Sequence, residues 1–368
     1  MDVLVVRADR EPLAGVDRPG PHELYRRPRL SVESRPLGAV PAGHLRVEMH
    51  LVGICGTDLH AIQCDPATGY ILGSAPLEIG PAGRVLGHEG VGRVQEVGSG
   101  VSGIRRRDWV AFESLETCHR CAACRGGRFN QCENAVLVGM QRDGVFAEIV
   151  DLPAQLAHDV NDLAADEPGR RAAACIEPAA CSYVALALAR VKPGEDVLIF
   201  GAGPIGIFAA MLARLAFGAA SVQIVEPLPF RREFAGRWAD RVCDVEEFFA
   251  EPVRRSTDVL IETSGQLENV DRSLVRVGPN GRIALLARCG APLGLRRVDH
   301  LITNNLSIIG SRGHLGGAVG HILQLYRDAR LPLHEAVTDV VQGLDSLKSA
   351  LSDPAALAGK HCKLLARL

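Results

Sequence analysis

Three residues of types that bind metal, Cys55, His88 and Glu89, occur in two short segments of the chain. A thiolate, an imidazole and a carboxylate form a mixed ligand set that suits Zn²⁺ with an exchangeable position. Thr57 and His60 follow Cys55 after two and five residues. A hydroxyl and an imidazole at these positions could carry a proton from the metal to water. The sequence therefore predicts acid–base chemistry at a catalytic zinc ion.

A second cluster consists of four cysteines with the spacing C-x2-C-x2-C-x7-C. Their thiolates could close a tetrahedron around zinc and fix a loop whose apolar content is too low for burial to hold it. Free surface thiols at this density would be an oxidation liability. An iron–sulfur cluster is a further alternative, but the spacing fits a structural zinc loop better. The four residues are Cys118, Cys121, Cys124 and Cys132.

A dinucleotide-binding pattern, G-x-G-x-x-G, directly follows an apolar strand and opens an apolar helix. Its glycines allow backbone amides and a helix N-terminus to approach a pyrophosphate. Glu226, 20 residues after the last glycine, could accept both ribose hydroxyls and would repel a 2′-phosphate. NAD is thus favoured, while neighbouring arginines keep NADP possible; a glycine turn used only for packing is the alternative. The predicted cofactor-binding residues are Gly201, Gly203, Pro204, Ile205, Gly206, Glu226 and Arg231.

The composition of the chain narrows the classes of protein to which it could belong. The 368 residues carry a formal net charge of −2, which gives no reason to expect nucleic acid or an anionic membrane as a partner. No apolar run approaches the ~18 residues of a membrane helix, and charges interrupt the N-terminal apolar run, so a strand is expected there, not a signal peptide. Clustered cysteines in a chain of this size indicate metal binding in a reducing cytosol. A soluble cytoplasmic protein is expected.

The spacing of apolar residues differs between the first and second parts of the chain. Short alternating strands without a long helix predict a small β-barrel-like domain first, followed by β-α-β units of a parallel sheet. Two Pro/Gly-rich segments, Arg10–Gly43 and Gln63–Val85, are expected to be mostly irregular. The expected strands are Asp2–Ala8, His44–Gly53, Gly90–Val97, Trp109–Phe112, Val197–Phe200, Ser221–Val225, Asp258–Glu262, Arg282–Leu286, Leu306–Ile309 and His361–Leu368, and the expected helices are Ile207–Phe217, Gly320–Ala329 and Gly343–Leu351.

These motifs together resemble the zinc-dependent medium-chain dehydrogenase/reductase family, within its polyol and sugar dehydrogenase branch. Gly144–Glu148, Glu177-Pro178 and Gly310–Gly313 extend the resemblance in the family's order. It implies an α/β protein: a GroES-like β-barrel catalytic domain over residues 1–190 and 325–368, and a Rossmann doubly wound parallel-sheet domain over residues 191–324. It also implies a homodimer or homotetramer.

The resemblance assigns roles to individual residues. It makes Cys55 and His88 ligands of the catalytic zinc, with Glu89 and Glu177 competing for the remaining positions. Glu177 could instead cap a helix. Cys175 is an alternative ligand that the register of the motif disfavours.

Two further residues receive supporting roles. Asp58 would orient His88 as a partner behind the metal ligand, although a surface charge is the alternative. Glu113 occupies a place where sugar-type relatives hold a substrate hydroxyl, and it could equally be structural.

The implied reaction is hydride transfer between NAD(P) and a secondary alcohol or ketone of a polyol, sugar or cyclitol-like substrate. The enzyme alternatives are a threonine-type amino-alcohol dehydrogenase, an aldehyde or ketone reductase, and a zinc-free quinone reductase. An alternative outside the enzymes is a non-catalytic protein that binds NAD and zinc. The span from Cys55 to His88 is longer than the family leads one to expect. Segments 10–43 and 63–85 could therefore reshape the substrate mouth, or else form solvent-exposed padding or an oligomer contact.

Overall fold

The computed structural model describes residues 1–253, 256–314 and 317–368. Contacts between residues divide the chain into two compact units. The first unit comprises Met1–Glu177, Val337–Leu357 and Lys363–Leu368, and the second comprises Pro178–Ala336 and Ala358–Cys362. The predicted limits of independent domains, after residues 190 and 324, stay a prediction.

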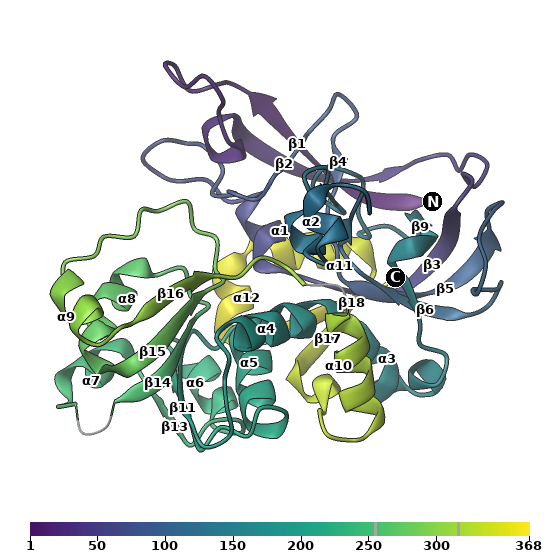
Figure 1. Ribbon diagram of the computed structural model, residues 1–368. Coiled ribbons are helices and arrows are strands. Elements are labelled where there is room, and N and C mark those ends of the chain that lie inside the picture. The colour runs from purple at the N-terminus through teal and green to yellow at the C-terminus, as the bar shows by residue number, and fades with distance from the viewer. Residues whose placement is uncertain (254–255, 315–316) are drawn as a thin grey trace. The chain divides into compact units, whose positions relative to one another are not determined.

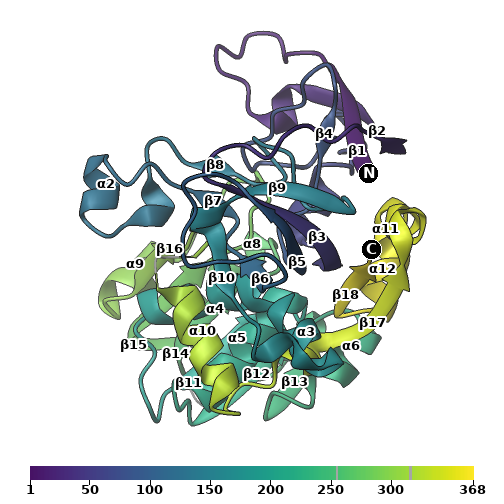
Figure 2. The same cartoon turned by 90° about the vertical axis from the view of Figure 1, so that its right-hand side faces the viewer.

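The first unit is built mainly of strands (Figures 1 and 2). They are β1 (Asp2–Arg10), β2 (Tyr25–Ser34), β3 (His44–Gly53), β4 (Arg84–Val85), β5 (Gly90–Val97), β6 (Trp109–Phe112), β7 (Leu115–Glu116), β8 (Val136–Leu137), β9 (Ile149–Pro153), β10 (Ala157–Asp159), β17 (Val337–Gln342) and β18 (Lys363–Arg367). The largest sheet has the order β10-β6-β5-β3-β18-β17, with β9 also paired to β3. A second sheet has the order β2-β1-β4, and β7 pairs with β8. The helices of this unit are α1 (Gly56–His60), α2 (Ala122–Arg125), α3 (Glu167–Ala173) and α11 (Gly343–Ser352).

Strand β3 illustrates why these sheets form. Leu45, Val47, Met49 and Leu51 alternate along it and are almost completely buried, as expected for a strand with one face on a core. The predicted strands at β3, β5 and β6 are confirmed residue for residue. Because β3 pairs with β5, β9 and β18, it lies at the centre of the sheet, and its C-terminal end leads directly to Cys55.

The second unit contains a six-stranded parallel sheet with helices packed on it (Figure 1). Its strands are β11 (Asp196–Phe200), β12 (Ser221–Val225), β13 (Arg241–Cys243), β14 (Thr257–Glu262), β15 (Val277–Leu285) and β16 (Ser307–Gly310). The order β13-β12-β11-β14-β15-β16 is that of a doubly wound dinucleotide-binding sheet. The remaining helices are α4 (Ile176–Leu188), α5 (Pro204–Leu215), α6 (Pro229–Ala235), α7 (Val245–Ala250), α8 (Leu267–Ser273), α9 (Val298–Thr303), α10 (Ala318–Arg327) and α12 (Pro354–Lys360).

The segment over residues 10–43 is mostly irregular, as expected, but it contains the ten-residue strand β2, which was not predicted. It pairs antiparallel with β1, and charged pairs such as Arg7–Glu33 and Arg29–Asp9 connect the two strands. The alternation of β2 is therefore carried partly by charges, which a search for apolar residues overlooks. Segment 63–85 is mostly irregular, as expected, with only β4 at its end.

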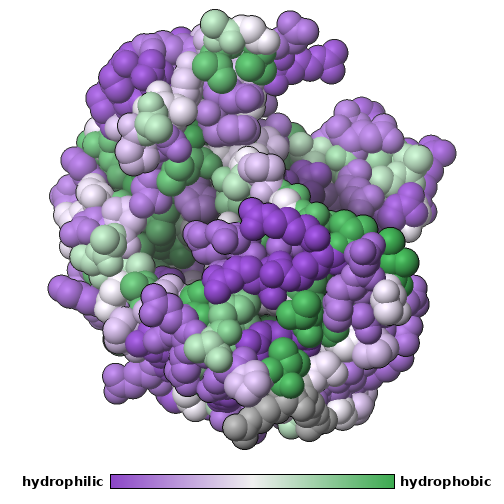
Figure 3. Space-filling model, turned by 90° about the vertical axis from the view of Figure 1, so that its left-hand side faces the viewer, coloured by the Kyte–Doolittle hydropathy of each residue, from purple (hydrophilic) through white to green (hydrophobic). Residues whose placement is uncertain are grey.

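Within the described residues, no single helix is long and apolar enough to cross a membrane, although the bent pair α3 and α4 meets the length and composition test together. On the face shown in Figure 3, hydrophilic residues cover most of the surface.

Candidate active site

The structure brings Cys55, His88 and Glu89 together in the first unit. Their ligand atoms all lie within 4.8 Å of one another. Cys55 stands between β3 and α1, while His88 and Glu89 stand between β4 and β5. His88 and Glu89 are buried at 5% and 1% exposure, and Cys55 is half-buried. A thiolate, an imidazole and a carboxylate at this separation fit one zinc ion with room for a further ligand.

Asp58 ties the two ligand segments together. Its Oδ2 accepts a hydrogen bond of 3.0 Å from the Cys55 amide, and its Oδ1 accepts one of 3.1 Å from the Gly87 amide. Burial would lower the pKa of His88, but the charges of Asp58 and Cys55 raise it well above its usual value. The site therefore favours a positive charge at this place, and zinc would have to displace the proton of the imidazole in order to bind.

Gly87 is required by the backbone that delivers His88. Its φ is +86°, and a Cβ atom there would lie 2.3 Å from the ring of Phe146. Only glycine combines this conformation with this close approach. Any larger residue would displace the segment that carries two of the three ligands.

Lys363 is a site residue that the sequence analysis missed. It is completely buried, and its Nζ donates to the carbonyl oxygen of Ile54 at 3.0 Å and to Glu89 Oε2. Burial alone would lower the pKa of Lys363, but the charges of Glu89, Cys175 and Cys55 outweigh burial and raise it. Lysine is rare in this chain, which could have drawn attention to it, but Glu89 lies 274 residues away.

The predicted proton-relay residues share α1 with the ligand Cys55 at its N-cap. Thr57 Oγ1 lies 3.7 Å from Cys55 Sγ. His60 is the last residue of the helix, and burial lowers the pKa of its imidazole. His60 follows Thr57 by three residues, somewhat less than one helical turn. A neutral imidazole at this position is suited to receive a proton from the hydroxyl. The relay itself stays a prediction.

Glu177 and Glu113 lie outside the group of three ligand atoms. Glu177 Oε1 accepts a hydrogen bond of 2.7 Å from the buried hydroxyl of Ser114. Glu113 Oε1 lies 3.0 Å from Nε2 of His158, which β10 supplies. Both carboxylates thus have protein partners, and their predicted roles toward metal and substrate stay predictions.

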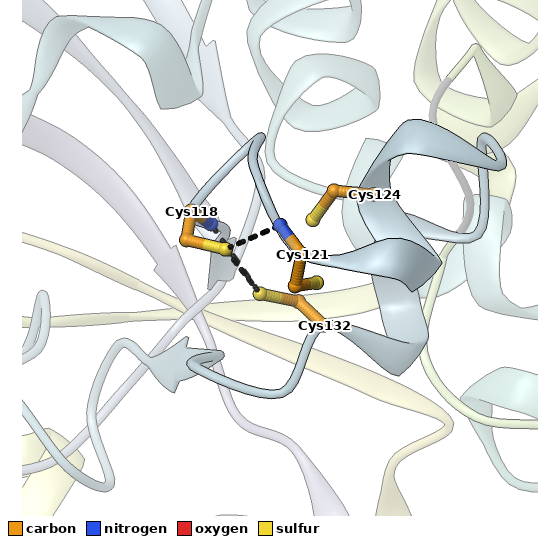
Figure 4. A group of neighbouring side chains, drawn as sticks. All are labelled: Cys118, Cys121, Cys124 and Cys132. Atoms are coloured by element: carbon orange, nitrogen blue, oxygen red, sulfur yellow. Dashed lines mark hydrogen bonds between the residues drawn. The ribbon is translucent and has the colours of Figure 1, made fainter.

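The four cysteines of the second cluster point toward one another (Figure 4), and their sulfur atoms lie within 4.8 Å of one another. The Cys121 amide donates to Cys118 Sγ at 3.4 Å, and the Cys118 amide donates to Cys132 Sγ at 3.3 Å. Backbone amides of Arg120 and Cys121 lower the pKa of Cys118 to about 6. Amide donors aimed at sulfur favour thiolates, the form that binds zinc, so this loop fits a structural zinc site.

The glycine-rich loop of the second unit joins β11 to α5. A Cβ atom on Gly206 would lie 2.0 Å from the carbonyl oxygen of Gly201, so this helix entry requires glycine. Gly203 caps the helix, and Pro204 and Ile205 form its first turn. The amides at this N-terminus are available to a pyrophosphate.

Glu226 lies beside the same loop. It is buried at 4% exposure, and its Oε2 accepts a hydrogen bond of 2.7 Å from the Ala202 amide. Arg231 approaches the loop from α6, because its Nη1 lies 3.6 Å from the position of a Cβ atom on Gly203. A carboxylate and a guanidinium therefore flank the place where the pattern predicts a dinucleotide.

Comparisons with known proteins agree with this geometry. The family model "Alcohol dehydrogenase GroES-like domain" matches residues 41–162, and "Zinc-binding dehydrogenase" matches residues 204–325. The L-threonine 3-dehydrogenase of Pyrococcus abyssi is 32% identical over 316 residues, covering 84% of this chain and 87% of that protein. The chain belongs to the zinc-containing medium-chain alcohol dehydrogenase superfamily.

The names of two other similar proteins refer to sugar derivatives. The L-galactonate-5-dehydrogenase of Escherichia coli is 38% identical over 187 residues, covering 51% of this chain and 50% of that protein. The structure of galactitol-1-phosphate dehydrogenase from Escherichia coli is 25% identical, covers 100% of both chains and has a TM-score of 0.81. The chain is thus a zinc-dependent NAD(P) dehydrogenase, and the predicted family, fold class, zinc ions and nicotinamide cofactor are confirmed.

Proposed function

We propose that this superfamily member interconverts a secondary alcohol and its ketone on a polar carbon skeleton such as a polyol, sugar or cyclitol. The observation that carries the proposal is the ligand group of Cys55, His88 and Glu89, which includes a carboxylate. Its Cys55 is the N-cap of the helix that holds Thr57 and His60. When bound there, zinc supplies Lewis acidity that lowers the pKa of a coordinated hydroxyl.

Residues of the chain would bind the metal and transfer the proton. Cys55, His88 and Glu89 would hold the metal, and in the oxidative direction Thr57 would accept the proton of the substrate hydroxyl. His60 would then pass a proton to solvent, and a bound nicotinamide would supply the acceptor for the hydrogen on the substrate carbon and its electron pair. One proton and one hydride leave the alcohol, so the products are a ketone, NADH and a proton.

NAD is the proposed cofactor. The buried carboxylate of Glu226 suits two ribose hydroxyls and disfavours a 2′-phosphate. The nearby guanidinium of Arg231 is the feature that would let NADP bind as well.

A threonine-type amino alcohol is the second candidate substrate, because the Pyrococcus abyssi relative is 32% identical over most of both chains. A panel of polyols, sugars, cyclitols and L-threonine, assayed for NAD⁺ and NADP⁺ reduction at 340 nm, tests both candidates. Turnover of L-threonine alone would replace the first candidate. No turnover by a preparation with two zinc ions per chain would reject both.

We also propose that the protein is cytoplasmic and forms a homodimer or homotetramer, as the resemblance to the family implies. No disulfide joins any of the eleven cysteines, all of which fall within the described residues, as in a reducing compartment. Light scattering of the purified protein would test the subunit number, and a monomer would reject it.

A further inference from the structure

Glu262 is a buried carboxylate at the carboxyl end of the parallel sheet. It is the last residue of β14 and has 0% exposed surface. Its partner in the pairing with β11 is Phe200. Phe200 and Leu260, which lie on the same face of the sheet as Glu262, belong to an apolar core cluster. Water therefore screens a charge on this side chain only weakly.

The two oxygens of this carboxylate have different surroundings. Oε1 accepts hydrogen bonds from the Ser264 amide at 2.7 Å, the Ser264 hydroxyl at 2.6 Å and the Gly265 amide at 2.8 Å. Oε2 is buried without a hydrogen-bond partner, and no cation among the described residues pairs with Glu262. Burial raises the pKa of Glu262, while the donors to Oε1 oppose that shift and favour the ionised form. The negative charge of the ionised form is thus not neutralised by a neighbouring cation.

The segment that Glu262 holds lies directly against the glycine-rich loop. Thr263 Oγ1 donates to the carbonyl oxygen of Phe200 at 2.7 Å, and a Cβ atom on Gly201 would lie 2.9 Å from that hydroxyl oxygen. The same Cβ atom would lie 3.3 Å from the Cα atom of Ser264, which is an exposed residue. Segment 263–265 and the glycine-rich loop therefore adjoin where β14 and β11 end.

The order of the strands relates this segment to one half of a dinucleotide. From β11 the chain adds β12 and β13 on one side, and β14, β15 and β16 on the other. A dinucleotide lies across the carboxyl ends of the strands at such a switch point, with one half on each side. Glu226, which suits the adenosine ribose, directly follows β12. We therefore expect the nicotinamide half on the side of β14, where Glu262 lies.

We propose that the charge of Glu262 makes the protein favour the oxidised over the reduced cofactor. The nicotinamide ring is positively charged in NAD⁺ and uncharged in NADH, so a buried negative charge on its side of the sheet attracts only the oxidised ring. Glu262 acts without touching the cofactor, because it has no exposed surface. In the oxidative direction, this preference assists the binding of NAD⁺ and the release of NADH.

Cations on the same side of the sheet oppose this effect only in part. Arg288 and Arg312 follow β15 and β16, and they are exposed and half-buried, respectively. Solvent therefore screens their charges more strongly than the charge of the fully buried Glu262. The proposal rests on the nicotinamide cofactor and does not depend on which alcohol is the substrate.

The test measures cofactor binding by the zinc-loaded full chain in the absence of any alcohol. In Glu262→Gln, the amide oxygen can replace Oε1, and the amide nitrogen takes the place of the unpartnered Oε2. Calorimetric titration with NAD⁺ and fluorescence titration with NADH give the two Kd values. The ratio of the Kd for NAD⁺ to the Kd for NADH should rise about fivefold or more, because the lost charge acts on the oxidised ring alone. An unchanged ratio, including an equal proportional change in both Kd values, would indicate a purely structural role and overturn the proposal.

Two further variants separate the charge from the shape of the side chain. Glu262→Asp keeps the charge and should keep a ratio close to that of the wild type. Glu268→Gln removes an exposed carboxylate from the first turn of α8 and should leave both Kd values unchanged. A Glu262→Asp ratio equal to that of Glu262→Gln, or a similar shift of the ratio in Glu268→Gln, would overturn the proposal.

A Glu262→Gln variant that fails to fold does not end the test. Glu262→Met also removes the charge, and an apolar residue of similar size in place of a buried charge is often tolerated. The folded Glu262→Met protein should show the same rise in the ratio, even where both cofactors bind more weakly. A wild-type ratio in this variant, or the failure of both uncharged variants to fold, would show that Glu262 serves the fold alone and overturn the proposal.

Discussion

Oδ1 of Asp58 lies 3.5 Å from Nδ1 of His88, and the Asp58 side chain is completely buried. A carboxylate at this place fixes the ring orientation of a zinc-binding imidazole and increases its basicity. Asp58→Asn should therefore lower zinc affinity or turnover by about 10–100-fold. Zinc analysis and kcat/KM check this, with the exposed Asp17→Asn as the control. Wild-type values for both quantities would contradict the role.

The cysteine cluster should carry a zinc ion that is separable from catalysis. Cys121→Ser should lose one of two zinc ions per chain and lower the Tm by about 4 °C or more, the shift produced by a loss of about 1–2 kcal/mol in a unit of this size. Metal analysis and calorimetry measure both changes. Cys64→Ser, a half-buried cysteine outside the cluster, should retain two zinc ions. Equal zinc contents in the two variants would refute the structural site.

The pH profile should report His60. Burial lowers the pKa of His60 below its usual value of 6.5, so the imidazole is neutral and able to accept a proton at neutral pH. As pH falls below 6.5, protonation of His60 blocks the relay and kcat should decline. His60→Ala should lower kcat at neutral pH by about tenfold or more and remove this acidic limb. His22→Ala should keep the wild-type profile, and an unchanged limb in His60→Ala would exclude it from the relay.

Cofactor choice should depend on Glu226. Its loss would remove hydrogen bonds to a charged group worth about 1.5–3 kcal/mol each, so Glu226→Ala should raise the KM for NAD⁺ about tenfold or more. The KM for NADP⁺ should fall relative to that for NAD⁺, because the repulsion of a 2′-phosphate disappears. Steady-state kinetics with both cofactors measure the ratio, and Glu233→Ala on α6 is the matched control. An unchanged ratio of the two KM values would count against a role of Glu226 in cofactor choice.

Segment 63–85 should influence substrate choice, because it packs beside α1. A Cβ atom on Gly73 would lie 3.3 Å from the carbonyl oxygen of His60, and the Ile71 amide donates to the carbonyl oxygen of Tyr25 in β2. Replacing the exposed turn at residues 65–69 by a shorter one should change the ratio of kcat/KM values across the substrate panel while preserving zinc content. A proportional change for every substrate would favour a purely structural role.

Local patterns predicted much of this molecule correctly. The strands β3, β5, β6 and β12 coincide with their expected residues because each has an apolar run or alternation bounded by glycine or charge. The helix α5 begins three residues earlier than expected, at Pro204, since proline fits the first helical turn. Both metal clusters followed from residue type and spacing.

What escaped prediction depends on contacts between distant parts of the chain. Strand β17 is held by parallel pairing with β18, and its own sequence mixes polar and apolar residues. Lys363 resembles any other lysine near a chain end until β18 pairs with β3 and places it against Glu89. A side chain whose partner lies 274 residues away has no spacing signal that a single sequence could reveal.

The pairing of β18 with β3 also has a consequence for biosynthesis. Most of the first unit is translated before the second, yet Lys363 leaves the ribosome only after the whole second unit has been made. Until then, Glu89 would be a buried charge without its cation, and the edge of β3 that receives β18 would be open. The nascent first unit should therefore remain incompletely folded while the second unit is translated, and acquire its lasting metal site only once β18 has been made.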